Sequence, residues 1–191
     1  MSSTAPSGRR DVRRNRERLI AAATRAYASG DDRVPLETIA KDAGVGIATL
    51  YRHFPTREDL VEAIYRDQVE RLRAGADELL TAYAPAEALR RWMDLFADWA
   101  ATKHGMIDAL RAVVFSGRLG MGEMREHLVG IVRLFLDAGA AAGDLRCDVA
   151  ADDVAATLAG VLAVAGAPEQ RAQAMRMFDL LIDGLRPAAR P

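Results

Sequence analysis

The segment Leu36–Phe54 (LETIAKDAGVGIATLYRHF) constrains the fold more than any other part of the chain. Two short stretches with apolar residues at helical spacing flank Gly44, and two short helices joined by such a turn form a helix-turn-helix. Ala40 supplies the small side chain that closely crossing helices need, and Gly44 accepts the positive φ of a sharp turn. The residues expected to form the shared core are Leu19, Ala23, Ile39, Val45 and Leu50.

Burial of those residues determines which side of the helix predicted over 47–54 is exposed. Small residues at its start permit close entry into a DNA major groove. The hydroxyl, guanidinium and imidazole groups that follow suit phosphate and base-edge contacts. A plain helical hairpin with a polar face is the alternative, and the Pro-Thr-Arg-Glu sequence that comes next argues against it. The exposed residues are Gly46, Ile47, Ala48, Thr49, Tyr51, Arg52 and His53.

The rest of the chain also favours helix. Alanine, leucine and arginine are abundant, and all three lose little entropy in a helix. We find no alternating segment that indicates a strand, so the predicted fold class is all-α with about nine helices. Helices are predicted over 12–29, 35–43, 47–54, 57–83, 85–103, 106–115, 123–142, 150–165 and 168–185. The expected domains are a disordered basic arm (1–11), a helix-turn-helix domain (12–56) and a helical ligand-binding and dimerisation domain (57–191).

The distribution of charge is uneven. The net charge of the 191 residues is −1, yet residues 1–60 hold 11 Lys and Arg against 8 Asp and Glu. A local basic excess on a near-neutral protein suggests contact with a polyanion, and a solubilising tail is the alternative. The single cysteine, Cys147, makes no intramolecular disulfide. The sequence has no apolar segment typical of a signal peptide or a membrane span. We therefore expect a cytoplasmic protein without membrane association.

The segments Thr49-Leu-Tyr-Arg-His-Phe54 and Pro55-Thr-Arg-Glu-Asp-Leu60 resemble the signature of the TetR (tetracycline-repressor-like) family, and Ile39–Val45 is similar too. The resemblance is strong over about residues 12–62. It implies that residues 46–49 face bases or the groove wall and that Tyr51 and His53 contact phosphates. The further contacts it implies come from Arg13, Arg14, Thr38 and Arg57. The chain departs from the family in having Val34-Pro35 where Ser or Thr often caps the second helix.

The C-terminal part carries no catalytic constellation, so we expect no enzyme activity, no cofactor and no metal site. An enzyme or carrier would need a polar cluster in the bundle, which the spacing of His104, His127 and Cys147 does not supply. Bulky residues of the central helices form either core or the wall of an apolar ligand pocket. The resemblance places the family's ligand site among these helices. The pocket candidates are Trp92, Met93, Phe96, Trp99, His104, Phe115, Met124, His127 and Phe135.

The last two predicted helices combine small and large apolar residues, which suits close helix packing. In the family they pair with the same helices of a second subunit, and closure of the monomer core is the alternative. The interface candidates are Val154, Leu158, Val161, Leu162, Met175, Phe178, Leu181 and Ile182. The expected function is that of a transcriptional regulator, most simply a repressor. It binds palindromic operator DNA as a homodimer and is released by a small-molecule effector. A ligand-independent DNA-binding regulator with a filled C-terminal core is the alternative.

Overall fold

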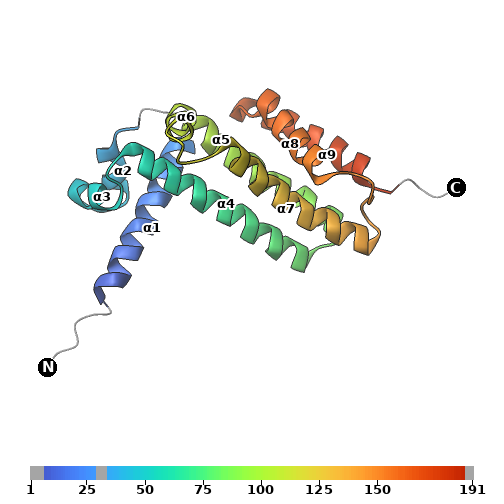
Figure 1. Cartoon of the computed structure of the whole chain (residues 1–191), viewed down its shortest axis with the longest axis horizontal. Coiled ribbons are helices and arrows are strands. Elements are labelled where there is room, and N and C mark those ends of the chain that lie inside the picture. Colours follow the sequence, from blue (N-terminus) through green and yellow to red (C-terminus); the bar gives the residue numbers. More distant parts are fainter. Residues whose placement is uncertain (1–6, 29–33, 188–191) are drawn as a thin grey trace. The chain divides into compact units, whose positions relative to one another are not determined.

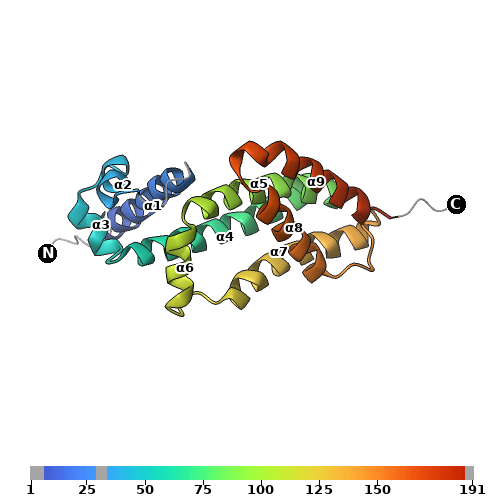
Figure 2. The same ribbon diagram turned by 90° about the horizontal axis from the view of Figure 1, so that it is seen from above.

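The computed structural model describes residues 7–28 and 34–187, and every regular element in these ranges is helical (Figure 1 and Figure 2). The predicted all-α fold class is confirmed. The helices are α1 (Ser7–Ala28), α2 (Leu36–Asp42), α3 (Ile47–His53), α4 (Arg57–Ala82), α5 (Pro85–Gly105), α6 (Ile107–Phe115), α7 (Met121–Ala142), α8 (Ala151–Ala165) and α9 (Arg171–Leu185), with a 3₁₀ turn, η1, over Pro168–Gln170.

The chain forms two compact units. Unit 1 contains the residues up to Asp67 together with Thr102–Arg118, and unit 2 contains Gln68–Ala101 and the residues from Leu119 onward. Helix α4 therefore contributes to both units. Helix α6 belongs to unit 1 although it lies between α5 and α7 in the sequence. The sequence-based division at residue 56 does not separate the chain in this way.

Most helix ends lie within a few residues of their predicted positions, and the starts of two helices differ more. Helix α1 begins at Ser7 rather than at residue 12, so residues 7–11 are helical and not part of a disordered arm. Four of the six residues 9–14 are arginines, which are good helix formers and extend the helix toward the N-terminus. The predicted ninth helix begins as η1, and regular α-helix starts only at Arg171. The rest of the predicted arm, residues 1–6, lies outside the described residues.

Each unit has its own apolar core. In unit 1, Leu19, Ala23, Ile39 and Leu50 have no exposed surface, as the helix-turn-helix interpretation requires, and Val45 is half-buried. In unit 2, one cluster of buried residues joins α5, α7, α8 and α9 with the second half of α4. None of the helices in the described ranges is long and apolar enough to cross a membrane.

Candidate nucleic-acid interface

The turn between α2 and α3 has the geometry of a helix-turn-helix. The Gly44 N–H donates to the Lys41 carbonyl (2.9 Å) and the Val45 N–H donates to the Ala40 carbonyl (3.0 Å). Gly44 has φ +64°, where a side chain is strained, and a Cβ at this position would collide with the guanidinium of Arg18. The positive φ therefore favours glycine here, and a Cβ would in addition displace the end of the Arg18 side chain.

Helix α3 buries one side and exposes the other. Leu50 is fully buried, while Ile47 and Tyr51 are 36% and 46% exposed. Arg52 is exposed and donates to the Thr49 hydroxyl oxygen (2.9 Å), which holds the guanidinium along the helix. Gly46 is the N-cap residue, and no side chain covers its Cα. Ala48 is also exposed. The exposed side of α3 thus begins with small residues and continues with Tyr51, Arg52 and the half-buried His53.

Arg57 connects three parts of unit 1. It lies half-buried at the start of α4, and its two terminal nitrogens donate to the Tyr27 hydroxyl and to the Val34 carbonyl, both at 2.8 Å. Helix α4 is thereby tied to the end of α1 and to the segment before α2. Both terminal nitrogens donate within the protein, whereas the sequence-based prediction directs this side chain to the DNA backbone.

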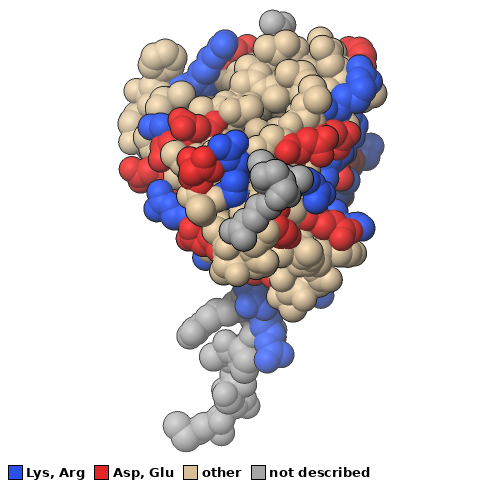
Figure 3. Space-filling view, turned by 90° about the vertical axis from the view of Figure 1, so that its right-hand side faces the viewer, with Lys and Arg blue, Asp and Glu red and all other residues tan. Residues whose placement is uncertain are grey.

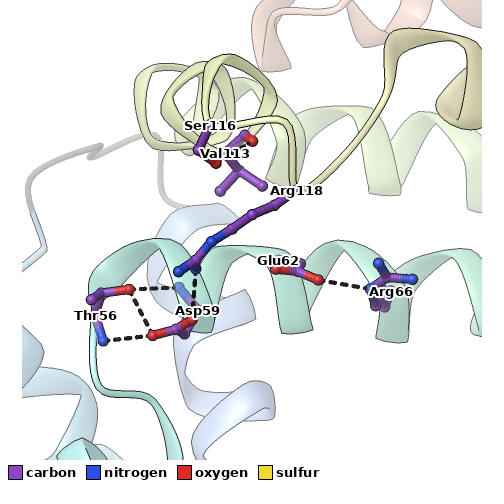
Figure 4. A network of polar contacts seen from close by, with 7 residues as sticks. All are labelled: Thr56, Asp59, Glu62, Arg66, Val113, Ser116 and Arg118. Atoms are coloured by element: carbon purple, nitrogen blue, oxygen red, sulfur yellow. Dashed lines mark hydrogen bonds and ion pairs between the residues drawn. The ribbon is translucent and has the colours of Figure 1, made fainter.

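The start of α4 is also tied to the loop that follows α6 (Figure 4). The Asp59 N–H donates to the Thr56 hydroxyl oxygen (3.1 Å) and the Thr56 N–H donates to the Asp59 carboxylate (2.8 Å), which is a reciprocal N-terminal cap. Arg118 forms an ion pair with the other oxygen of this carboxylate (2.6 Å). The hydrogen bond from the Thr56 hydroxyl, assisted by Arg118, lowers the pKa of Asp59 below its ordinary value. Thr56 is therefore the N-cap residue of α4.

Other predicted DNA contacts lie on the surface of unit 1. Thr38 is exposed on α2, and Arg13 and Arg14 are exposed on α1, where Arg13 pairs with Glu17 (3.4 Å). Two arginines that the sequence-based prediction left out lie against the helix-turn-helix. Arg18 covers Gly44, and the Arg16 guanidinium lies 5.4 Å from the centre of the Phe54 ring. Their position in the N-terminal arginine run was the available signal.

Figure 3 shows basic and acidic side chains interspersed over the body of the molecule that faces the viewer. That face carries no continuous basic area of the kind that binds nucleic acid through charge alone. The net charge of −1 agrees with a local basic surface rather than a uniformly basic one.

The pocket candidates fall into three groups. Trp92, Phe96 and Trp99 stack along α5, with ring centres 5.4 and 5.3 Å apart, and Phe135 lies 5.6 Å from Trp92. The Trp92 indole N–H donates to the Leu72 carbonyl (2.8 Å). The other candidates in unit 2 are Met93, which is fully buried, and Met124 and His127, which are half-buried; His104 and Phe115 are exposed and belong to unit 1.

The interface candidates on α8 and α9 mostly face their own core. Five are buried within the cluster of unit 2: Val154, Leu158, Val161, Phe178 and Ile182. The remaining three, Leu162, Met175 and Leu181, are half-buried and pack against it. Of the two alternatives for these helices, closure of the monomer core accounts for most of the residues chosen.

Two family models match the chain. Residues 19–64 match the model described as bacterial regulatory proteins, tetR family, and residues 84–187 match the model described as transcriptional regulator SbtR-like, C-terminal domain. Together they cover the helix-turn-helix and most of unit 2, the second alone spanning more than half of the chain. The chain belongs to the TetR family of transcriptional regulators.

Solved structures agree with this assignment. The TetR transcriptional regulator SCO0520 from Streptomyces coelicolor is 48% identical with a TM-score of 0.82, over 91% of this chain and 99% of that one. A γ-butyrolactone receptor (ArpA-like protein) is 27% identical with a TM-score of 0.61, over 94% and 92% of the two chains. Among relatives found by sequence, an HTH-type transcriptional regulator of Staphylococcus aureus (strain USA300) is 38% identical over 53 residues. The match spans 27% of this chain and only 29% of that protein. As a TetR-family member, the protein is a DNA-binding transcriptional regulator.

Proposed function

We propose that this TetR-family regulator is a ligand-responsive repressor. It binds an operator of two inverted half-sites as a homodimer and leaves the operator when a small apolar molecule binds in unit 2. The observation that carries the proposal is the exposed side of α3, where Gly46, Ile47 and Ala48 allow close approach to base edges. Tyr51 and Arg52 follow on the same helix with groups that bind phosphates and bases.

Readout of the sequence rests on few side-chain hydrogen bonds, because Gly46, Ile47 and Ala48 have no polar side-chain atoms. Apolar contact with thymine methyl groups and the shape of the DNA supply the remaining discrimination. Two α3 helices in a dimer read half-sites separated by about one helical turn, roughly 34–36 Å.

The second subunit binds to the exposed side of α8 and α9. Residues 154–168 contain no charged side chain, so α8 presents Ala159, Gly160 and Ala163 to solvent beside Val164, which is 65% exposed. On α9, Leu180 is 73% exposed. Burial of such a surface against its own copy stabilises a dimer through the hydrophobic effect.

The effector binds at the aromatic stack of α5. Trp92 and Phe96 are almost fully buried and Trp99 is half-buried, so an apolar ligand enters beside Trp99 and displaces core contacts farther in. The structural similarity to a γ-butyrolactone receptor supports a small lactone as the first compound to test. The chain has two tryptophans, both in this stack, so intrinsic tryptophan fluorescence reports directly on binding there.

Release requires that the ligand prefer one of two conformers. The chain passes between the units at Asp67/Gln68 in α4 and on either side of Thr102–Arg118. Within unit 1, Arg118 holds the start of α4 through Asp59, and Arg57 holds the same start against α1. A ligand-dependent shift of residues 102–118 would therefore move α4 and change the spacing of the two α3 helices.

Two experiments test the proposal. An operator is first selected from random duplexes, and fluorescence anisotropy then compares it with a scrambled duplex at one salt concentration. The expected preference is about 10³-fold or more, and a γ-butyrolactone that quenches tryptophan fluorescence should abolish it. Equal binding to both duplexes would refute a specific repressor. The protein could instead prefer the operator while every compound that changes its tryptophan fluorescence leaves operator binding unaltered. That result would favour the ligand-independent regulator.

The dimer is tested by light scattering after size-exclusion chromatography. Leu180→Asp should give a monomer, and Phe115→Asp, which charges an even more exposed apolar residue on α6, should leave the dimer intact. A Leu180→Asp protein that stays dimeric would place the interface elsewhere.

A further inference from the structure

Three basic residues lie near the C-terminal end of α3, and the Arg52 guanidinium among them is held on the Thr49 hydroxyl. The Arg16 guanidinium, from α1, lies 5.4 Å from the centre of the Phe54 ring. The ring of His53 lies 6.2 Å from the same ring, and Arg52 precedes it on α3. Two helices that are distant in the sequence thus bring three basic groups to one end of the recognition helix.

Phe54 fixes the position of Arg16. The ring is 2% exposed, so it belongs to the core and cannot turn away, and a guanidinium over an aromatic face is attracted by its quadrupole. The Arg16 side chain is itself exposed. An arginine held in this way loses less conformational freedom when its donors bind an anion than a freely mobile one does.

The group is electrostatically incomplete in the free protein. Within residues 7–28 and 34–187, no carboxylate forms an ion pair with Arg16, Arg52 or His53. Burial, together with the positive charges of Arg16 and Arg52, lowers the pKa of His53 below its ordinary value. The positive charges of Arg16 and Arg52 attract an anion to this surface, and a phosphodiester is such an anion.

We infer that Arg16 is a further contact to the DNA backbone and that it binds, with Arg52 and His53, the phosphates at the C-terminal end of α3. The inference rests on the DNA binding proposed above and deepens it. It adds a residue of α1 to the predicted contacts. It also makes Phe54 a positioning residue, because its ring aligns the guanidinium that binds the phosphate.

Proton uptake follows from the same arrangement. In the free protein burial, together with Arg16 on α1 and Arg52 on α3, lowers the pKa of His53 and favours its neutral form, and Phe54 contributes no charge. A phosphate beside the imidazole raises its pKa again, so binding takes up a proton when the pH lies between the free and bound values. Operator affinity should therefore rise as the pH falls from about 7 to about 6.

The test compares Arg16→Gln with Arg25→Gln, using full-length protein and the selected operator. Both changes remove one positive charge from an exposed position on α1, and the two residues lie about 14 Å apart along the helix. Anisotropy titrations over a salt series give the slope of log K against log salt concentration. Arg16→Gln should weaken binding about tenfold and reduce that slope by about 0.9 for each subunit. Arg16→Lys should restore most of the slope, and Arg25→Gln should behave as wild type.

Each outcome distinguishes the inference from the proposed function. If wild type prefers the operator but Arg16→Gln and Arg25→Gln have equal slopes, the inference is wrong and the repressor proposal stands. If wild type binds operator and scrambled duplex equally, both fail. Thermal unfolding of Arg16→Gln must match wild type within a few degrees, which excludes a folding defect. His53→Gln should abolish the pH dependence between 6 and 7, and its persistence would remove His53 from the phosphate contact.

Discussion

The two units of this regulator are stabilised in different ways. In unit 1, α2 and α3 have only seven residues each, too few to be stable as isolated helices, so particular contacts hold them in place. Gly44 under Arg18 and Arg57 between Tyr27 and Val34 are such contacts. In unit 2, helices of 15 to 22 residues pack through broad apolar faces. In unit 1, the type of a single residue therefore indicates what it does. In unit 2, the role of an apolar residue depends on its position in the fold.

The largest expected loss of stability comes from the centre of unit 2. Trp92→Ala removes a fully buried indole that stacks on Phe96 and donates to the Leu72 carbonyl. It should lower the free energy of unfolding by about 3–5 kcal/mol, measured by urea denaturation. Trp99→Ala, at a half-buried position in the same stack, should cost clearly less. Equal losses of unfolding free energy for Trp92→Ala and Trp99→Ala would mean that the aromatic stack is not the core of the unit.

Leu50→Ala produces the corresponding cavity in unit 1. The side chain is fully buried between α3 and the helices beneath it, so the expected cost is about 3 kcal/mol. Because α3 depends on this contact, operator binding should be lost while the near-UV circular dichroism of the two tryptophans in unit 2 is retained. Loss of both signals together would show that the units unfold as one.

Arg57→Met keeps the aliphatic stem and removes both hydrogen bonds of the guanidinium. A hydrogen bond that involves a charged group contributes about 1.5–3 kcal/mol, so loss of both should destabilise unit 1 by about 3 kcal/mol, the lower end of the sum because Arg57 is only half-buried. Tyr27→Phe removes one of the two bonds and should give about half of that effect in the same denaturation experiment. If Arg57→Met lowers operator affinity without changing stability, its role would be the direct DNA contact that the sequence suggested.

The smallest expected effect concerns the ion pair between Arg118 and Asp59, whose side chains are 42% and 27% exposed. Arg118→Gln should cost less than about 1 kcal/mol at pH 7. The pKa of Asp59 is lowered in the folded protein, so its stabilising contribution is present above its unfolded pKa, near 4, and is lost as the pH falls through the folded value. Wild type and Arg118→Gln should therefore converge in stability in acid.

The control for that experiment is Arg111→Gln, which removes an ion pair with Asp108 inside α6. It should leave operator affinity unchanged, whereas Arg118→Gln should change it through the start of α4. Identical operator affinities for the two variants would remove the Arg118 contact from the coupling mechanism.

The fold and the DNA-binding side of α3 could be predicted from the sequence because both depend on local signals. The turn at Gly44 and the helix crossing at Ala40 each require a specific residue type in a short segment, and the structure has both as expected. The start of α1 was predicted too late because the arginine run was interpreted as a tail rather than as helix.

Other features depend on contacts between residues far apart in the sequence. The apolar periodicity of α8 and α9 does not say which of two apolar sides faces the core, so Leu158 and Phe178 were chosen and Val164 and Leu180 were not. Three further features also depend on contacts between distant residues: the attachment of α6 to unit 1, the role of Arg57 and the placement of Arg16 on Phe54. None of them leaves a pattern in a short window of sequence.

The central claim is that the exposed side of α3 recognises operator DNA, and one pair of variants tests it most directly. Tyr51→Ala removes a tyrosine from that side, and Tyr83→Ala removes a similarly exposed tyrosine from the segment after α4. Anisotropy on the selected operator at fixed salt should show a loss of about tenfold or more for Tyr51→Ala and none for Tyr83→Ala. Two proteins with wild-type affinity, or two equally impaired ones, would contradict the account.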